Sequence, residues 1–275
     1  MAYLSYTTSM LYLIIFFGLG LIIGSFLNVV LFRGERDMSF VSGRSQCLTC
    51  DKTIAWYDNI PLLSYLILGG KCRHCQAHIS WQYPLVELMT GILFSLAGSI
   101  FFDPLSNQAI LQTVWVLGLI IFLTLIVVAD FRSMEIPLWY LMAVNGITIA
   151  YLLAVYFLFE PQSVFFDTAL ASSLIGGALA WVFFFALVYF SKETWMGWGD
   201  VWLGLLGGLV VGVSHVLPML TLSFALGALY GVGLMVLQGR NLKTEVPFAP
   251  FLAFGILTTL FLIESFPRIF WFVSW

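Results

Sequence analysis

Long apolar stretches separated by short polar turns make up most of this chain. About eight of them reach the length of roughly 20 residues that an α-helix needs to cross a bilayer. They cover residues 9–32, 84–102, 109–130, 136–159, 164–190, 198–215, 216–238 and 248–274. The pattern therefore predicts an all-α membrane protein with about eight transmembrane helices and one small polar insertion after the first of them.

Composition supports this fold class. The chain of 275 residues is 61% hydrophobic and only 9% charged, and its mean hydropathy is +1.01. A water-soluble protein of this size could not bury so much apolar surface. The net charge of -3 gives no general attraction to nucleic acid, so we expect membrane lipid and no nucleic acid among its partners.

The positions of Lys and Arg predict the orientation of the helices. No basic residue precedes Arg33, whereas a cleavable signal peptide carries its positive charge ahead of the apolar stretch, so we expect a retained first helix. Most other basic residues fall in the insertion or in alternate turns, at Arg132, Lys192 and Arg240. By the positive-inside rule these turns face the cytosol and both chain ends lie outside.

All four cysteines lie in the polar insertion, as two Cys-x-x-Cys pairs. Cys47 and Cys50 form the first pair, and Cys72 and Cys75 form the second. This spacing is typical of a tetrahedral site of four thiolates, for which zinc is the default metal and iron is the chemical alternative. In the cytosol a metal site is favoured over disulfides. With four protein ligands the site would be structural.

The insertion also gives the predicted division of the chain. We expect a first transmembrane helix over residues 1–33, a cytosolic metal-binding loop over 34–83, and a seven-helix membrane core over 84–275. Within the loop, the apolar run from Ile60 to Leu68 is too short to span a bilayer, and we expect it to lie against the membrane face.

Two aspartates stand at the ends of long apolar stretches. Asp130 ends the stretch before the turn FRSMEIP, and Asp200 follows the turn Gly197-Trp198-Gly199. The helix count puts both on the cytosolic face. The stretch after Asp200 is short, which indicates a recessed, partly wet site. Two carboxylates brought together there would share a proton, one activating water and the other protonating a carbonyl. The pair predicts aspartyl protease chemistry.

Other interpretations stay open at this stage. Asp130 could end its helix beside Arg132, and Asp200 could be an acid favoured by a helix N-terminus. Buried acids also serve as proton relays in transporters, which is the main alternative function. Gly197 and Gly199 would let a substrate backbone pass close to Asp200.

The chain resembles the type IV prepilin peptidases. The resemblance rests on GSFLNVVLFR at residues 24–33, both cysteine pairs, NIPLLSYLILGGKC, YPLVE, ADFRSMEIP, MGWGD and PFAPFLAFG, in that order. It implies that Asp130 and Asp200 are catalytic. It also implies a bacterial inner-membrane enzyme that removes the short basic leader of prepilins and pseudopilins at the cytosolic face, and methylates the new N-terminus with S-adenosylmethionine. Trp202 stands where the family commonly has Lys.

The residues themselves do not show where methylation takes place. Asn28, Arg33 and Glu87 gather at the predicted cytosolic ends of the first two helices, as candidates for a substrate or cofactor site or as helix-end contacts. Lys192 and Glu193, with Gly197 and Gly199, complete the candidate positions. Acids of the insertion, namely Glu35, Asp37, Asp51 and Asp58, could meet a basic leader or form a solvated face.

Overall fold

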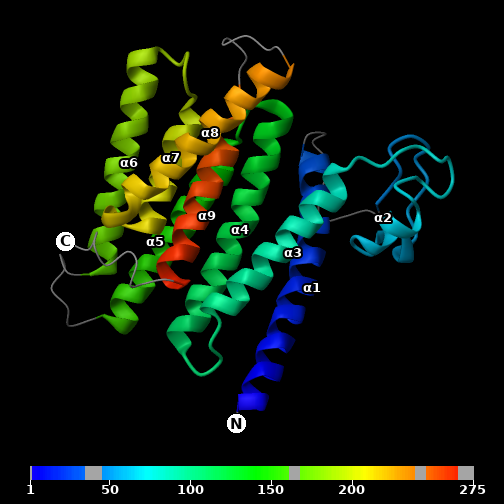
Figure 1. Cartoon of the computed structure of the whole chain (residues 1–275), viewed down its shortest axis with the longest axis horizontal. Helices are drawn as coiled ribbons and strands as arrows, with labels where there is room; N and C mark the ends of the chain where they lie inside the picture. The colour runs from blue at the N-terminus through cyan, green and yellow to red at the C-terminus, as the bar shows by residue number, and fades with distance from the viewer. Residues whose placement is uncertain (1, 35–44, 161–167, 239–245, 266–275) are drawn as a thin grey trace. The chain divides into compact units, whose positions relative to one another are not determined.

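The structure, a computed structural model, describes residues 2–34, 45–160, 168–238 and 246–265, and within them it is built from helices, turns and two isolated β-bridges (Figure 1). The main helices are α1 (Ala2–Gly34), α3 (Gln82–Phe101), α4 (Asn107–Ser133), α5 (Leu138–Phe159), α6 (Ala169–Ser191), α7 (Trp198–Val211), α8 (Val216–Gln238) and α9 (Ala249–Ser265). Each of the eight predicted stretches therefore corresponds to one helix. Glu35 and Asp37 lie outside the described residues.

The lengths of these helices agree with a multi-pass membrane protein. Among the described residues, six helices are long and apolar enough to cross a bilayer, and α7 and α9 are shorter apolar helices. The predicted fold class is confirmed. The predicted end of one helix at residue 215 is wrong, because Gly212 has a φ of 72° and ends α7. A 3₁₀ turn, Val213–His215, then leads into α8.

The chain divides into two compact units, Met1–Phe102 and Asp103–Trp275. In the first unit, α1 packs along α3. Their backbones approach closely at Gly24, where a Cβ atom would lie 2.8 Å from Cα of Glu87. Between α1 and α3 the chain forms the cysteine subdomain (residues 45–80), with the 3₁₀ helix Trp56–Asn59 and the short helix α2 (Leu63–Ile67). The apolar run predicted to lie against the membrane thus contains one short helix.

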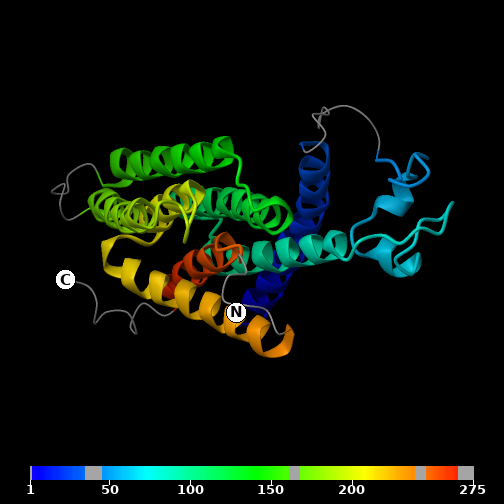
Figure 2. The same cartoon turned by 90° about the horizontal axis from the view of Figure 1, so that it is seen from above.

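In the second unit, α7 packs against α5, α6 and α9 (Figure 2). Its side chains Leu203, Leu206 and Leu209 are almost completely buried. α7 has 14 residues and is therefore about 21 Å long, less than the roughly 30 Å of the bilayer core. A helix of this length does not span the bilayer core by itself, and α5, α6 and α9 cover its sides.

Gly208 on α7 and Gly176 on α6 lie back to back, so that a Cβ at Gly208 would overlap the backbone of Gly176. We expect Gly208→Ala to separate the two helices and to destabilise the second unit by about 1 to 3 kcal/mol. The measurement is thermal unfolding in detergent, with Gly118→Ala as the matched control because a Cβ at Gly118 meets no atom within 4 Å. Equal melting temperatures for the two variants would contradict this packing.

Candidate active site and metal centre

Asp130 lies in the last turn of α4, and its side chain is buried, with 6% of its surface exposed. Its Oδ2 atom accepts a hydrogen bond of 3.1 Å from the backbone N–H of Ala249, the first residue of α9. The first N–H groups of a helix have no partner within the helix and carry the positive end of its dipole. α9 therefore provides a donor and a favourable field for the charge of Asp130.

Asp200 lies in the first turn of α7 and is half-buried. Its Oδ2 atom accepts a hydrogen bond of 3.2 Å from the backbone N–H of Gly197, the residue that caps the helix. This is the return bond of a capping box, in which an acid at the third helical position bonds back to the N-cap. The bond fixes the carboxyl group of Asp200 at the start of α7.

The structure brings the two aspartates into one neighbourhood within the second unit. They lie close enough for a Coulomb interaction between their carboxylates. α9 joins the two positions, because it packs against both α4 and α7 and donates the Ala249 N–H to Asp130. Two acids that interact in this way oppose each other's ionisation.

The segment before α7 forms the surroundings of Asp200. Glu193 accepts a hydrogen bond of 2.8 Å from the indole nitrogen of Trp198, and Lys192 is exposed with a left-handed backbone. Gly197 is exposed, whereas Gly199 lies next to the side chain of Ile136. The predicted positions around Asp200 all belong to the second unit; they are Lys192, Glu193, Gly197 and Gly199. The other three predicted positions belong to the first unit; they are Asn28, Arg33 and Glu87.

The bond from Ala249 is the part of the site that sequence reasoning missed. The motif PFAPFLAFG contains two prolines, Pro247 and Pro250, and proline is favoured near the start of a helix. In the structure α9 begins at Ala249, between these prolines, and its N–H points to Asp130. The spacing of the prolines indicates where the last helix begins, but it does not indicate that the first N–H of this helix donates to Asp130.

The four cysteines form a compact cluster in the first unit. The Sγ atoms of Cys47, Cys50, Cys72 and Cys75 all lie within 4.8 Å of one another. Cys47 and Cys75 have an Sγ to Sγ distance of 3.7 Å. Four thiolates about 2.3 Å from a tetrahedral zinc ion are about 3.8 Å apart, so the arrangement fits zinc.

The two cysteine pairs sit on matching turns. Cys47 N–H donates to the carbonyl of Lys52 and Cys72 N–H to that of Ala77, and each turn ends in a residue with positive φ after its second cysteine. Backbone hydrogen bonds at Thr49 and Cys50 lower the pKa of the Cys47 thiol to about 6, whereas the pKa of the Cys75 thiol is raised to about 11 by burial and by the neighbouring thiols. A thiol that ionises easily is a good metal ligand. Any metal bound by all four thiolates would have no open position for a substrate.

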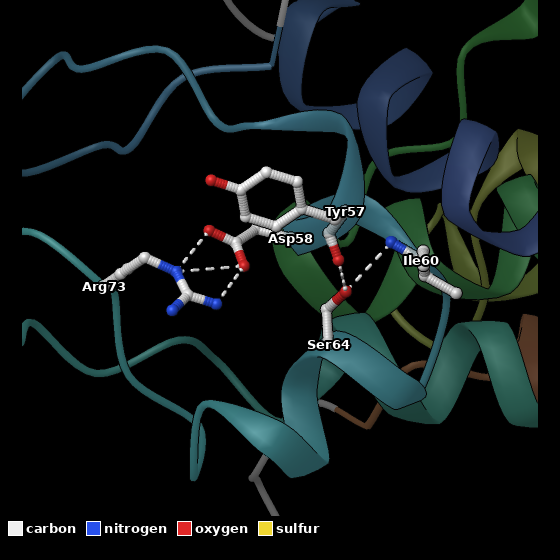
Figure 3. Close-up of polar contacts among 5 residues, drawn as sticks. All are labelled: Tyr57, Asp58, Ile60, Ser64 and Arg73. Atoms are coloured by element: carbon white, nitrogen blue, oxygen red, sulfur yellow. Dashed lines mark hydrogen bonds and ion pairs between the residues drawn. The ribbon is translucent and has the colours of Figure 1, made fainter.

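An ion pair braces the cysteine subdomain next to this cluster (Figure 3). The guanidinium of Arg73 donates to both carboxylate oxygens of Asp58, with a shortest distance of 2.6 Å, and this contact lowers the pKa of Asp58. Ser64 donates to the carbonyl of Tyr57 and accepts from the N–H of Ile60. The pair joins the segment between the cysteine pairs to the second pair itself.

We expect Asp58→Asn to destabilise this subdomain slightly. The rate of proteolytic cleavage within residues 45–80 at neutral pH should rise by no more than several-fold. The effect is small because exposed ion pairs stabilise proteins weakly. Since the pKa of Asp58 is lowered by folding, the pair contributes above the usual pKa of Asp, and the contribution disappears as the pH falls through the lowered value. Asp51→Asn, at an exposed position, is the control and should behave as the wild type.

Asn28 and Glu87 are both buried where α1 and α3 meet, and Arg33 is buried five residues after Asn28 on α1. Asn28 Nδ2 donates to the carbonyls of Gly24 and Tyr83, at 3.3 Å and 3.2 Å. Glu87 Oε2 accepts from the backbone N–H of Leu62, at 2.9 Å. Asn28, Arg33 and Glu87 all line one cavity of the first unit.

Comparison with known proteins assigns both units. Residues 19–101 match the profile of the Bacterial Peptidase A24 N-terminal domain, and residues 117–232 match that of the Type IV leader peptidase family. The chain belongs to the type IV leader peptidase family. The resemblance stated from the sequence is thus confirmed, and the protein is an enzyme. The second match contains both Asp130 and Asp200, and the first contains all four cysteines.

Several relatives carry the name prepilin leader peptidase/N-methyltransferase. The chain is 37% identical to one from Vibrio cholerae over 230 residues, which cover 77% of this chain and 82% of the relative. It is 35% identical to one from Bacillus subtilis, with 88% of this chain and 90% of the relative covered. Another, from Aeromonas salmonicida, is 30% identical, with 96% and 94% covered. No solved structure matches the chain.

Proposed function

We propose that this leader peptidase family member cleaves the basic leader from type IV prepilins and pseudopilins by an aspartyl dyad of Asp130 and Asp200. The observation that carries this proposal is the Coulomb interaction between two carboxylates, one from the end of α4 and one from the start of α7, each of which accepts a hydrogen bond from a backbone N–H at a helix N-terminus. The names of the relatives supply the substrate class.

In this mechanism a water molecule lies between the two carboxyl groups. One carboxylate removes a proton from the water while its oxygen attacks the scissile carbonyl, and the other, protonated, aspartic acid gives a proton to the carbonyl oxygen. The tetrahedral intermediate then collapses, and the leaving amine receives a proton. The dyad titrates as a unit, so neither role is assigned to a single aspartate. The exposed Gly197 leaves room for the substrate backbone beside Asp200.

The substrate would be a precursor whose apolar helix lies in the bilayer while its leader remains on the cytosolic side. We place the protein in the bacterial inner membrane, with the cysteine subdomain and the dyad at the cytosolic face, because the basic turns follow the positive-inside rule. The division into residues 1–33, 34–83 and 84–275 is part of this proposal, as is contact with membrane lipid along the exposed apolar faces of the helices.

We assign zinc to the four thiolates as a structural ion, held by Cys47, Cys50, Cys72 and Cys75. The close approach of the four sulfur atoms supports this choice. The subdomain has few buried apolar side chains of its own, and a bound ion would supply the stability that such a small unit lacks. His74 and His78 are exposed and are not among the proposed ligands.

The second proposed activity is methylation of the new N-terminus with S-adenosylmethionine, as the names of the relatives imply. The test incubates purified protein with a prepilin and measures the product mass with and without S-adenosylmethionine. We expect one cut that removes the leader, and a product heavier by one methyl group only when the methyl donor is present. An intact precursor would contradict the proposed peptidase activity and would favour the alternative function, a transporter with a carboxylate proton relay.

A further inference from the structure

A cluster of polar groups with interlocking contacts lies inside the first unit, whereas the two aspartates belong to the second unit. It consists of Ser25 and Asn28 on α1, and Tyr83 and Glu87 on α3. Asn28 donates to the carbonyl of Tyr83, and Glu87 interacts by hydrogen bonds with the Ser25 side chain and the Leu62 N–H. The close crossing of the two helices at Gly24 brings these groups together. The packing of α1 against α3 therefore fixes the positions of these polar groups.

The carboxamide of Asn28 has an oxygen that the fold does not satisfy. Asn28 is 2% exposed, its Nδ2 makes two hydrogen bonds, and its Oδ1 is buried without a partner among the described residues. The two bonds of Nδ2 fix the orientation of the amide, so Oδ1 is an acceptor. A buried acceptor without a partner destabilises the folded state and is uncommon in native proteins. It calls for a donor that the chain itself does not supply.

Asn145 in the second unit provides a useful comparison. Its Nδ2 donates to the carbonyls of Leu141 and Trp202, and its Oδ1 is also buried without a partner among the described residues. Hydrogen bonds of this kind can therefore hold two helices together without forming part of a binding site. What Asn28 has in addition is a carboxylate close by and a cavity that both residues line.

The cavity lies between the helix pair and the cysteine subdomain and has a volume of about 430 Å³. Ser25, Asn28 and Glu87 line it at the helix pair, and Arg73, His74 and Asp58 line it at the subdomain. A volume of this size is in the range of small-molecule and cofactor sites. The end formed by the helices is lined by residues that carry a carboxylate, a hydroxyl and a carboxamide.

We propose that this cavity is the methyl-transfer site, and that Asn28 Oδ1 and the Glu87 carboxylate bind the amino group that is methylated. The inference rests on the proposed methyltransferase activity and names its amine-binding residues. A primary ammonium has three N–H donors and one positive charge, which match a cluster with one charged and two neutral acceptors. The amine is the new N-terminus of the cleaved substrate.

The chemical step needs an amine with an available lone pair. The ammonium gives one proton to the Glu87 carboxylate, and its nitrogen lone pair then forms a bond to the methyl carbon of S-adenosylmethionine. The carbon–sulfur bond breaks and its electron pair returns to sulfur, which leaves S-adenosylhomocysteine and a methylated ammonium. Glu87 afterwards releases its proton to water. Asn28 holds the nitrogen in line with the methyl carbon, which is the main requirement of such a displacement.

The test measures peptide binding without any methyl donor. Purified full-length protein is titrated with a leaderless prepilin peptide that has a free amino terminus, and with the same peptide after N-acetylation. We expect the wild type to prefer the free amine by about tenfold or more, as for one charge-assisted contact. Glu87→Gln and Asn28→Ala should bring the ratio of the two affinities close to one and remove methylation, while leader cleavage remains.

Glu87→Gln keeps the shape of the side chain and removes its charge. It therefore tests the proposed binding of the amino group even if Asn28→Ala does not fold. Asn145→Ala is the matched control, because it removes the same pair of bonds from the other unit, and it should keep the preference for the free amine. An unchanged preference in Glu87→Gln would overturn the proposal. So would a loss of affinity for S-adenosylhomocysteine with the amine preference intact, because the cluster would then bind the donor. A wild type that cleaves without methylating would contradict the proposed function instead.

Discussion

Asp130→Asn and Asp200→Asn should each lower the rate of leader cleavage by at least about 10³-fold, because either change removes one of the two proton-transfer groups. An amide oxygen can still accept the hydrogen bonds from Ala249 and Gly197, so we expect both variants to fold. The measurement is the single-turnover rate of cleavage of a prepilin by purified protein, read from the disappearance of the precursor mass.

The control for this pair is Asp103→Asn. Asp103 is an exposed acid before α4 in the same unit, and its replacement should leave the cleavage rate within a factor of about two of the wild type, as is usual for surface changes. Cleavage near the wild-type rate in either Asp130→Asn or Asp200→Asn would show that the reaction does not use a dyad.

Cys50→Ser should release the metal and unfold the cysteine subdomain. Structural zinc sites stabilise small domains by about 10 to 16 kcal/mol relative to the apo form, far more than this subdomain could replace by its own packing. Elemental analysis should find one zinc ion per wild-type chain and less in the variant, and limited proteolysis should cut the variant rapidly within residues 45–80.

His74→Ala is the matched control, because His74 is an exposed residue between two of the cysteines. It should keep the full content of zinc and the resistance to proteolysis. Iron in the wild type would show that the site is correct but the metal is not. A full content of zinc in Cys50→Ser would contradict a site made of four thiolates.

The helices and the metal cluster could be predicted from the sequence for simple reasons. A bilayer-spanning helix is defined by its length and hydropathy, which are local properties of the sequence. The spacing of Cys47, Cys50, Cys72 and Cys75 is the pattern that a site of four thiolates requires. The end of α7 was misplaced because residues 212–215 are as compatible with a helix as with the 3₁₀ turn that the backbone of Gly212 introduces.

The contacts across the fold could not be predicted in the same way. The bond from Ala249 to Asp130 joins residues 119 positions apart, and it depends on where α9 begins relative to the end of α4. The unsatisfied oxygen of Asn28 is also invisible in the sequence, since it follows from which two carbonyls the amide nitrogen meets. Such features depend on the relative placement of helices, which hydrophobic patterns do not specify.

Asp130 and Asp200 act from one site in the proposed mechanism, and a crosslink between the two positions tests this most directly. In a chain carrying Asp130→Cys and Asp200→Cys, a short bifunctional thiol reagent should join the two positions, as identified by the mass of the linked peptides. The pair Asp103→Cys and Asp130→Cys is the control, because position 103 precedes the start of α4 and position 130 lies in its last turn, so the two should not be joined. A failure to join positions 130 and 200, while each thiol reacts separately with a maleimide, would contradict the dyad.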